Sequence, residues 1–211
     1  MEMHLSYAPH LKGMSHIGRS RWHRVVPGDW DRAVRNIDDL EKQQALRRRF
    51  LDGIPWSETG LFELLERRIR KDGVADHCRT KQDIIDRYRR VDALYEQAKT
   101  EGRLRTCVER DPRAEGERLG VRVLLDRDGR FIFQGRGHHR LAIARALKLR
   151  SMPVGLIVAH PHAVRNGHLD RLRRERAETL RRLNLALPRS GLGLRLDPIS
   201  YAIALKALCR A

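Results

Sequence analysis

Apolar residues recur every three or four positions in three stretches of the first half of the chain. This spacing places apolar side chains on one face of a helix, and it predicts helices over residues 37–51, 57–73 and 80–102. Ser57 and Thr80 are typical N-cap residues, so each is expected to begin a helix. Glycines at the ends of the second and third stretches predict that these two helices end there.

The period of the pattern changes from helical to strand-like after residue 120. Alternation over Val121–Leu125 predicts a strand, Asp128-Gly129 predicts a two-residue hairpin turn, and Phe131–Phe133 predicts the returning strand. A helix is expected over Leu141–Leu147 and a buried strand over Val154–Val158, with a break at the intervening proline.

The two ends of the chain are less regular. Residues 1–27 show no periodicity and predict an arm or an irregular strand, while a thin leucine stripe predicts an arginine-rich helix over 165–185. A last short helix is expected over 198–208. The whole pattern predicts an α+β protein with a helical N-terminal region (1–80), an α/β module (81–162) and an Arg-rich helical tail (163–211).

The chain of 211 residues carries a formal net charge of +17. Seven of its 44 basic residues are lysines, which leaves 37 arginines. A charge of this size favours a partner that carries phosphate, either a nucleotide or a nucleic acid. A GC-rich genome also favours arginine over lysine, so the charge does not decide between these two partners.

Composition also limits location and chemistry. No run approaches the roughly 18 apolar residues of a membrane span, so no membrane partner is expected. Residues 1–13 lack the continuous apolar core of a signal peptide, which predicts a cytoplasmic protein. Cys78, Cys107 and Cys209 lie far apart and form no CxxC pair, so neither a disulfide framework nor a zinc site is expected.

The segment Gly135–Arg140 combines a glycine-rich loop with the start of a helix, directly after a predicted strand. The first amides of a helix are unpaired and carry a partial positive charge, and glycines let the backbone approach an anion closely. Arg140 offers a bidentate clamp for phosphate oxygens, and His138 and His139 add further donors. The sequence therefore predicts a phosphate-binding loop here.

This segment resembles the signature of the ParB/sulfiredoxin superfamily, in which a strand feeds a G-x-x-R loop that opens a helix. Gly137–Arg140 is nearest to the version carried by the free-serine-kinase branch. The resemblance continues in the helix that ends at Gly102, in the hairpin near Gly129 and in the Met152–Val154 entry to the next strand. It covers about a third of the chain, and it implies the ParB/sulfiredoxin-like fold for the α/β module.

The resemblance implies a nucleotide-binding protein that acts as a phosphotransferase or an NTP hydrolase. The implied cofactors are a nucleoside triphosphate or diphosphate and Mg²⁺. The implied phosphate-binding residues are Gly135, Arg136, Gly137, His138, His139 and Arg140. The implied catalytic residues are His139, Arg140 and, as the carboxylate, Glu96, with Asp92 as an equal alternative.

Departures from the family pattern leave other functions open. Position 138 is histidine where sulfiredoxins carry cysteine, which argues against their repair chemistry. No helix-turn-helix is evident after His160, which argues against a chromosome-partition role. The alternative is a nucleic-acid-binding protein or a ParB-like nuclease that uses the basic surface, and a third option is a partner-binding module whose loop is vestigial.

The remaining polar and aromatic residues favour structural roles. His138, His139, His160 and His162 lie near the module, but adjacent histidines diverge and rarely share one ion, so no metal site is expected. Trp30 and Trp56 are expected to anchor the core. Asp29 and Asp31 are expected to cap a helix. The sequence does not specify the oligomeric state.

Overall fold

The structure is a computed structural model that describes residues 3–7, 24–32, 34–114, 120–182 and 200–204. Contacts divide the chain into two units: the first comprises residues 1–37, 105–137 and 150–211, and the second comprises residues 38–104 and 138–149. These units group residues differently from the three consecutive segments expected from the sequence, which stay a prediction. One boundary between the units falls between Gly137 and His138, inside the glycine-rich motif.

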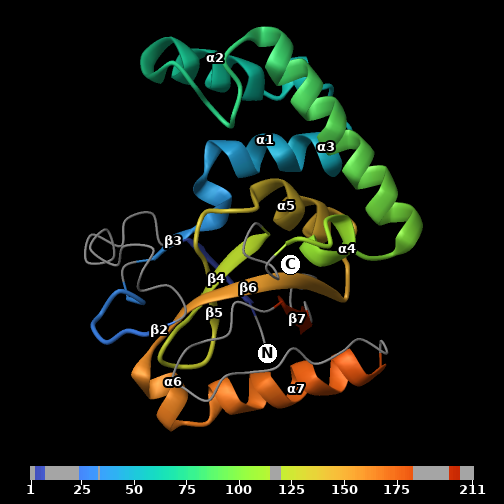
Figure 1. Cartoon of the computed structure of the whole chain (residues 1–211). Helices are drawn as coiled ribbons and strands as arrows, with labels where there is room; N and C mark the ends of the chain where they lie inside the picture. The colour runs from blue at the N-terminus through green and yellow to red at the C-terminus, as the bar shows by residue number, and fades with distance from the viewer. Residues whose placement is uncertain (1–2, 8–23, 33, 115–119, 183–199, 205–211) are drawn as a thin grey trace. The chain divides into compact units, whose positions relative to one another are not determined.

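The first unit is built on a mixed sheet (Figure 1). Among the described residues, the strands follow the order β2-β6-β4-β5-β1-β3, and β7 also pairs with β6. The strands are β1 (Met3–Tyr7), β2 (Arg24–Val25), β3 (Arg35–Asn36), β4 (Val121–Leu125), β5 (Phe131–Phe133), β6 (Ser151–Ala159) and β7 (Ser200–Ala204).

The centre of the sheet is buried. β2, β6 and β4 run parallel, and all five residues of β4 are buried although the sequence alternates only in part. Burial of consecutive residues is typical of a parallel strand that is covered on both faces. Trp30 packs against a core cluster formed by Leu124, Ile132, Ile157 and Val158.

The predicted hairpin between β4 and β5 is present, but its turn has three residues and not two. The amide of Asp126 donates to the carbonyl of Arg130 (2.9 Å), which leaves Arg127, Asp128 and Gly129 as the loop. Gly129 has φ +79, as expected for the left-handed residue that ends such a loop. Asp126 closes the turn by accepting from the amides of Asp128 (2.9 Å) and Arg130 (2.7 Å).

The expected short helix over 198–208 is wrong for its described part. Residues 200–204 form β7, which pairs antiparallel with β6 from Ser151 to Gly155. β6 itself contains Pro153, so the proline does not precede the strand as expected. Pro153 lies just before the residues of β6 that pair with β4, where its missing N–H costs no bond to that strand.

The helices of the first unit are α4 (Cys107–Arg110), α6 (Pro161–Arg165) and α7 (His168–Arg182). The arginine-rich helix expected over 165–185 corresponds to α7, and α6 ends at Arg165, where that helix was expected to begin. The two helices are separated at Gly167, whose φ of +71 ends a right-handed helix. Leu169 and Leu172 are buried, as the predicted leucine stripe requires.

The second unit is helical. Its helices are α1 (Glu41–Phe50), the 3₁₀ helix η3 (Trp56–Glu58), α2 (Leu61–Asp72), α3 (Lys81–Glu101) and α5 (His138–Ala146), and a short 3₁₀ helix, η2 (Ile37–Asp39), precedes α1. Thr80 forms a capping box with Asp83, and Gly102 ends α3 in the left-handed conformation, which confirms both predicted ends. Ser57 lies inside η3, so its predicted role as a helix cap is wrong, and α2 begins after Gly60.

Aromatic side chains form much of the core of the second unit. Trp56 packs edge-on against both Phe50 and Tyr88, and Phe50 stacks on Tyr95 at 4.7 Å between ring centroids. Trp56 is buried, which confirms its expected role. The helices and the mixed sheet together confirm the predicted α+β class. Within the described residues, no helix is both long and apolar enough to cross a membrane.

Candidate functional site

The loop half of the glycine-rich motif belongs to the first unit. Gly135 and Gly137 have φ values of +90 and +93, so both lie in conformations that favour glycine. A Cβ at Gly137 would lie 2.7 Å from the Cα of Val121, which is closer than real Cβ atoms come. Gly137 is therefore required by packing against β4, whether or not an anion approaches the loop. Arg136 is exposed, and its carbonyl accepts from the amide of Arg122.

The helical half of the motif belongs to the second unit and begins with His138. Nδ1 of His138 lies 2.9 Å from Nε2 of the buried Gln43 on α1. An amide nitrogen only donates, so Nδ1 accepts and this histidine is neutral. Burial, together with the charge of Lys42, lowers the pKa of His138 to about 3.

His139 lies against two side chains of the second unit. Its Nε2 is 3.2 Å from the hydroxyl of Tyr88 and 3.4 Å from Oδ2 of Asp76. Burial lowers the pKa of His139, although Asp76 acts in the opposite direction. His139 is therefore a neutral imidazole at physiological pH, oriented by a carboxylate in the manner of a general base.

Asp76 is the centre of this polar cluster. It accepts from Lys42 Nζ (2.9 Å), from Nε and Nη2 of Arg87 (2.9 and 3.1 Å) and from the Tyr88 hydroxyl (2.9 Å). Burial alone would raise the pKa of Asp76, but the hydrogen bond from His139, the charge of Lys42 and the hydrogen bonds from Arg87 outweigh it and lower the pKa strongly. Asp76 is therefore an ionised carboxylate that balances two cationic side chains.

A tight turn between α2 and α3 positions Asp76. Ala75 and Cys78 exchange backbone hydrogen bonds of 3.0 and 2.8 Å across it. Asp76 and His77 both have positive φ, +50 and +64. Two central residues with positive φ define the type I′ turn, and non-glycine residues in that conformation are frequent at functional sites.

Arg140 follows the two histidines and is buried, with 6% of its surface exposed. It makes further contacts within the folded chain. A buried guanidinium can contact a phosphate only if the phosphate is itself buried in the protein. The bidentate contact predicted for Arg140 therefore requires a ligand that is largely enclosed.

The structure does not bring Glu96 to the histidines. Glu96 is exposed on α3 and lies 4.0 Å from Lys99. It is eight residues from Tyr88, or about 12 Å at the rise of an α-helix. Asp92, the alternative, accepts from Arg49 (3.0 and 3.1 Å) and from Trp56 Nε1 (2.9 Å). The carboxylate beside His139 is Asp76, which sequence reasoning missed.

Sequence reasoning also missed the other members of this cluster: Lys42, Gln43, Arg87 and Tyr88. Each appears in the sequence as an ordinary helix residue, and only the fold of α1, α3 and α5 brings them together. One signal was available, since Asp76 and His77 fall between two predicted helices. A short polar connection of this kind is where binding and catalytic residues concentrate.

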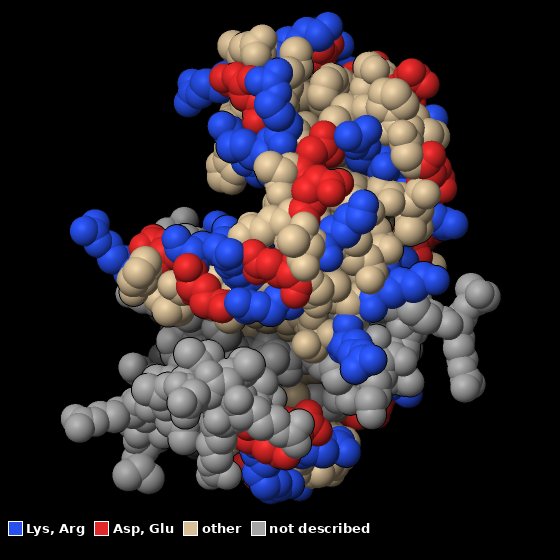
Figure 2. Space-filling view, turned by 90° about the vertical axis from the view of Figure 1, so that its right-hand side faces the viewer, with Lys and Arg blue, Asp and Glu red and all other residues tan. Residues whose placement is uncertain are grey.

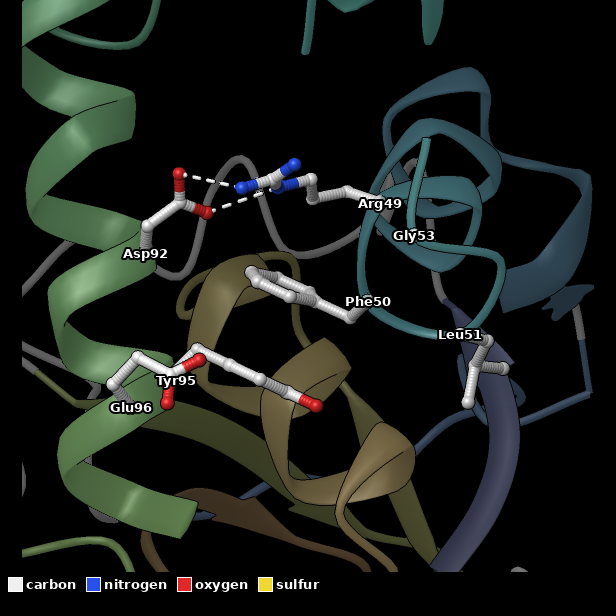
Figure 3. Close-up of a pocket in the computed structure, with 7 residues that line it drawn as sticks. All are labelled: Arg49, Phe50, Leu51, Gly53, Asp92, Tyr95 and Glu96. Atoms are coloured by element: carbon white, nitrogen blue, oxygen red, sulfur yellow. Dashed lines mark hydrogen bonds and ion pairs between the residues drawn. The ribbon is translucent and has the colours of Figure 1, made fainter. Parts of the chain in front are cut away.

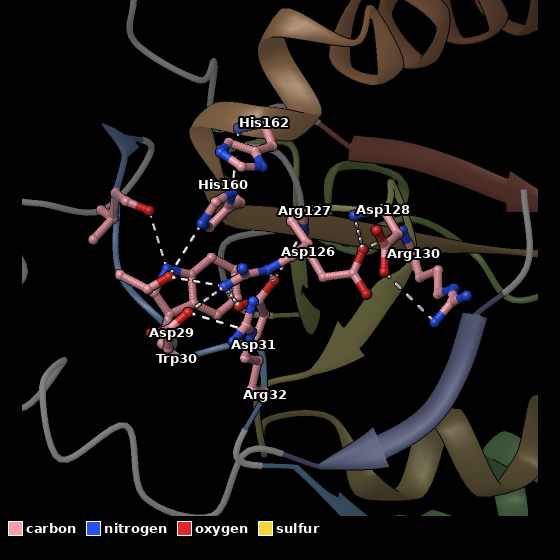
Figure 4. Close-up of polar contacts among 12 residues, drawn as sticks. Asp29, Trp30, Asp31, Arg32, Asp126, Arg127, Asp128, Arg130, His160 and His162 are labelled. Carbon is pink, nitrogen blue, oxygen red and sulfur yellow. Dashed lines mark hydrogen bonds and ion pairs between the residues drawn. The ribbon is translucent and has the colours of Figure 1, made fainter.

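A second polar cluster lies in the first unit, where the parallel strands end (Figure 4). Asp31 accepts from the amide of Arg127 (3.0 Å) and from its Nε and Nη2 (2.8 and 2.7 Å), and Asp29 accepts from Nη2 (2.8 Å). Burial would raise the pKa of Asp31, but Arg127 outweighs it and the pKa is lowered. The expectation that Asp29 and Asp31 cap a helix is therefore wrong, since both hold the β4–β5 turn.

His160 and His162 lie beside this second cluster. His160 is buried, donates from Nε2 to the carbonyl of Gly28 (3.1 Å) and accepts the amide of His162 at Nδ1 (3.1 Å). Both ring nitrogens of His160 are thus used in the fold. Over the described parts of the chain, no group of three or more His, Cys, Asp or Glu side chains could hold a metal ion. The described residues therefore form no site in which protein side chains alone would hold Mg²⁺.

The described cysteines are structural. Cys78 and Cys107 are both buried and neither forms a disulfide, and burial raises the pKa of the Cys78 thiol. This supports the interpretation of both residues as small buried thiols. Cys209 lies outside the described residues.

Comparison with known protein families, with curated proteins and with solved structures found no match to this chain. The resemblance to the ParB/sulfiredoxin superfamily therefore stays a hypothesis that rests on its motif residues.

The low pKa of His138 predicts a stability that depends on pH. The folded pKa of about 3 lies below the ordinary value of 6.5, so between these values the unfolded chain binds a proton that the folded chain excludes. Stability should fall as pH falls through this window, by up to about 1.4 kcal/mol per pH unit for one proton. The groups that act on His138 are Lys42, Arg68, Asp76 and His139.

Urea unfolding at pH 7, 6 and 5 would measure this dependence in the parent chain and in His138→Asn, whose side-chain oxygen can still accept from Gln43. We expect a shallower slope in His138→Asn. The exposed His77, whose positive φ asparagine also tolerates, provides the matched control His77→Asn. A slope that is unchanged in His138→Asn would contradict this account.

Proposed function

We propose that this protein binds the phosphates of a nucleotide at the first turn of α5 and acts as a phosphotransferase or an NTP hydrolase. The observation that supports the proposal is the charge of the surrounding cluster. Lys42 and Arg87 converge on the single carboxylate of Asp76, while His138 and His139 are neutral. The cluster thus has one positive charge more than it has negative charges.

Elementary electrostatics favours an anion at this place. The first amides of α5 carry the partial positive charge of the helix N-terminus, which adds to the excess charge of the cluster. Arg68 also acts on both Lys42 and His138. A half-buried excess of positive charge is costly unless an anion balances it, and phosphate is the anion that helix N-termini and arginines bind together.

His139 supplies the catalytic group in this proposal. With its Nε2 directed at Asp76 and Tyr88, Nδ1 is the atom that can accept a proton. An acceptor hydroxyl or a water would transfer its proton to Nδ1 as its oxygen bonds to the terminal phosphorus. The bond from that phosphorus to the bridging oxygen breaks, and the nucleoside diphosphate leaves. Arg140 would neutralise charge on the phosphoryl group.

A thermal-shift experiment tests the binding step. ATP, GTP, CTP and ADP, each at a hundredfold excess over its dissociation constant, should stabilise the protein by about 2.7 kcal/mol. That free energy is a shift of about 5–10 °C for a chain of this size. Nucleosides without phosphate should give no shift.

Two lysine substitutions distinguish nucleotide binding at this site from binding through the overall positive charge of the protein. Lys42→Met should abolish the shift, because it removes the excess positive charge of the cluster. Lys71→Met, at an exposed position of α2, should leave the shift intact. His139→Gln should keep binding and lose phosphoryl transfer, measured as phosphate or phosphoester formed. Full nucleotide affinity in Lys42→Met would exclude this site.

The net charge of +17 also supports the alternative, a nucleic-acid-binding protein or nuclease. On the face shown in Figure 2, however, basic and acidic atoms lie intermixed and do not form a stripe of one sign. On α7, the exposed Arg173 likewise pairs with Asp170 (3.0 Å). If nucleotides give no shift and DNA or RNA binds with a steep salt dependence, this alternative replaces the nucleotide proposal.

A further inference from the structure

The second unit contains a cavity of about 270 Å³ that shares no residue with the polar cluster around Asp76. It lies between the end of α1 and the middle of α3 (Figure 3). Its lining consists of Arg49, Phe50, Leu51, Gly53, Asp92, Tyr95 and Glu96.

Two aromatic rings give this cavity an apolar wall. Phe50 and Tyr95 stack almost in parallel, with an angle of 11° between their planes, and both are half-buried. Leu51 adds an exposed apolar side chain, with 53% of its surface accessible. A stacked pair of rings presents outer faces that carry partial negative charge, which attracts cations.

The charged residues of the cavity favour the same sign of ligand. Arg49 is held in a bidentate pair by Asp92, which also accepts from Trp56, so this pair is neutral at one end of the cavity. Glu96 is 65% exposed, and its Oε2 lies 4.0 Å from Nζ of Lys99, which is too far for a hydrogen bond. The carbonyl groups in the last turn of α1 add partial negative charge. The lining is therefore net negative in a protein of strongly positive net charge.

We propose that this cavity binds a small organic cation: a primary ammonium or guanidinium group on an apolar or aromatic body. The apolar body would lie against Phe50, Tyr95 and Leu51, and the cationic group would face Glu96. The volume suits a molecule of about ten non-hydrogen atoms, at about 20–30 Å³ for each atom. This site is independent of the proposed phosphate site, which selects the opposite charge.

Three probes of nearly equal size test the selection of charge. Benzylamine is cationic, benzyl alcohol is neutral and phenylacetate is anionic at pH 7. Saturation-transfer NMR titrations of the full chain should show saturable binding of benzylamine, about fivefold or more tighter than that of benzyl alcohol. Phenylacetate should not bind. Equal affinities for benzylamine and benzyl alcohol would overturn the proposal, and so would absence of benzylamine binding at about 10 mM.

Two exposed substitutions locate the binding without threatening the fold. Glu96→Gln should weaken benzylamine about fivefold and leave benzyl alcohol unchanged. Leu51→Lys should abolish benzylamine binding by placing a cation at the cavity. Glu63→Gln, an exposed position on α2, makes the same change in net charge as Glu96→Gln and should have no effect. Benzylamine affinity that is unchanged in both Glu96→Gln and Leu51→Lys would overturn the assignment.

Discussion

Replacing Asp76 by asparagine should destabilise the protein by about 3–5 kcal/mol, because it leaves two partly buried cations without their carboxylate. Lys42 and Asp76 each have 14% of their side chain exposed, and Arg87 has 25%, so water replaces little of the lost interaction. Asparagine keeps one oxygen for Tyr88 and His139, but its NH2 group would then face Nη2 of Arg87, which donates to the other carboxylate oxygen of Asp76. Urea unfolding at pH 7 would measure the change.

The control for this experiment is Asp72→Asn, at the exposed last residue of α2, where a change within about 0.5 kcal/mol is expected. The double variant Lys42→Met with Asp76→Asn should lose less than the sum of the single variants, because the uncompensated lysine is no longer present. A loss below about 1 kcal/mol in Asp76→Asn would show that the cluster tolerates its own excess charge, and it would remove the argument for an anion at α5.

Features encoded by neighbouring residues were predicted from the sequence. Thr80 and Asp83 form a capping box within one turn, and Gly102 ends the same helix. The signals for both are complete within four residues, so no tertiary contact is needed to recognise them. The same holds for the strands on either side of Gly129. The predicted length of the turn between these strands was nevertheless wrong. The loop has three residues because the side chain of Asp126 accepts from the amides of Asp128 and Arg130 and so closes the longer turn.

Features encoded by distant residues were not predicted. Residues 200–204 form a strand because β6 offers an unpaired edge some fifty residues earlier in the chain. Nothing in the local pattern distinguishes that strand from the short helix that was expected. The polar cluster has the same origin, since Asp76 lies in a turn, Lys42 on α1 and His139 on α5. The sequence motif pointed to Glu96 as the catalytic carboxylate, whereas the carboxylate that lies beside His139 in the structure is Asp76.

Gly137→Ala should destabilise the protein by about 3 kcal/mol, and this result would assign a structural role to the third residue of the predicted phosphate loop. Two costs add. A Cβ at φ +93 is strained, and the same Cβ would lie 2.7 Å from both Cα and Cγ2 of Val121 on β4. Backbone of a buried central strand cannot shift as a flexible side chain can.

Gly102→Ala separates the two costs. Gly102 also has positive φ (+64), but a Cβ there would meet no atom within 4 Å, so only the backbone strain of about 1 kcal/mol applies. Urea unfolding midpoints of the two variants, compared with the parent chain, give the difference that close packing contributes. If Gly137→Ala unfolds like Gly102→Ala and yet loses nucleotide affinity, the glycine serves the ligand and not the sheet. A larger loss of stability in Gly137→Ala shows that β4 alone requires a glycine at this position, so that the glycine signature by itself is no evidence for a phosphate. The argument for the anion then rests on Lys42, Arg87 and the start of α5.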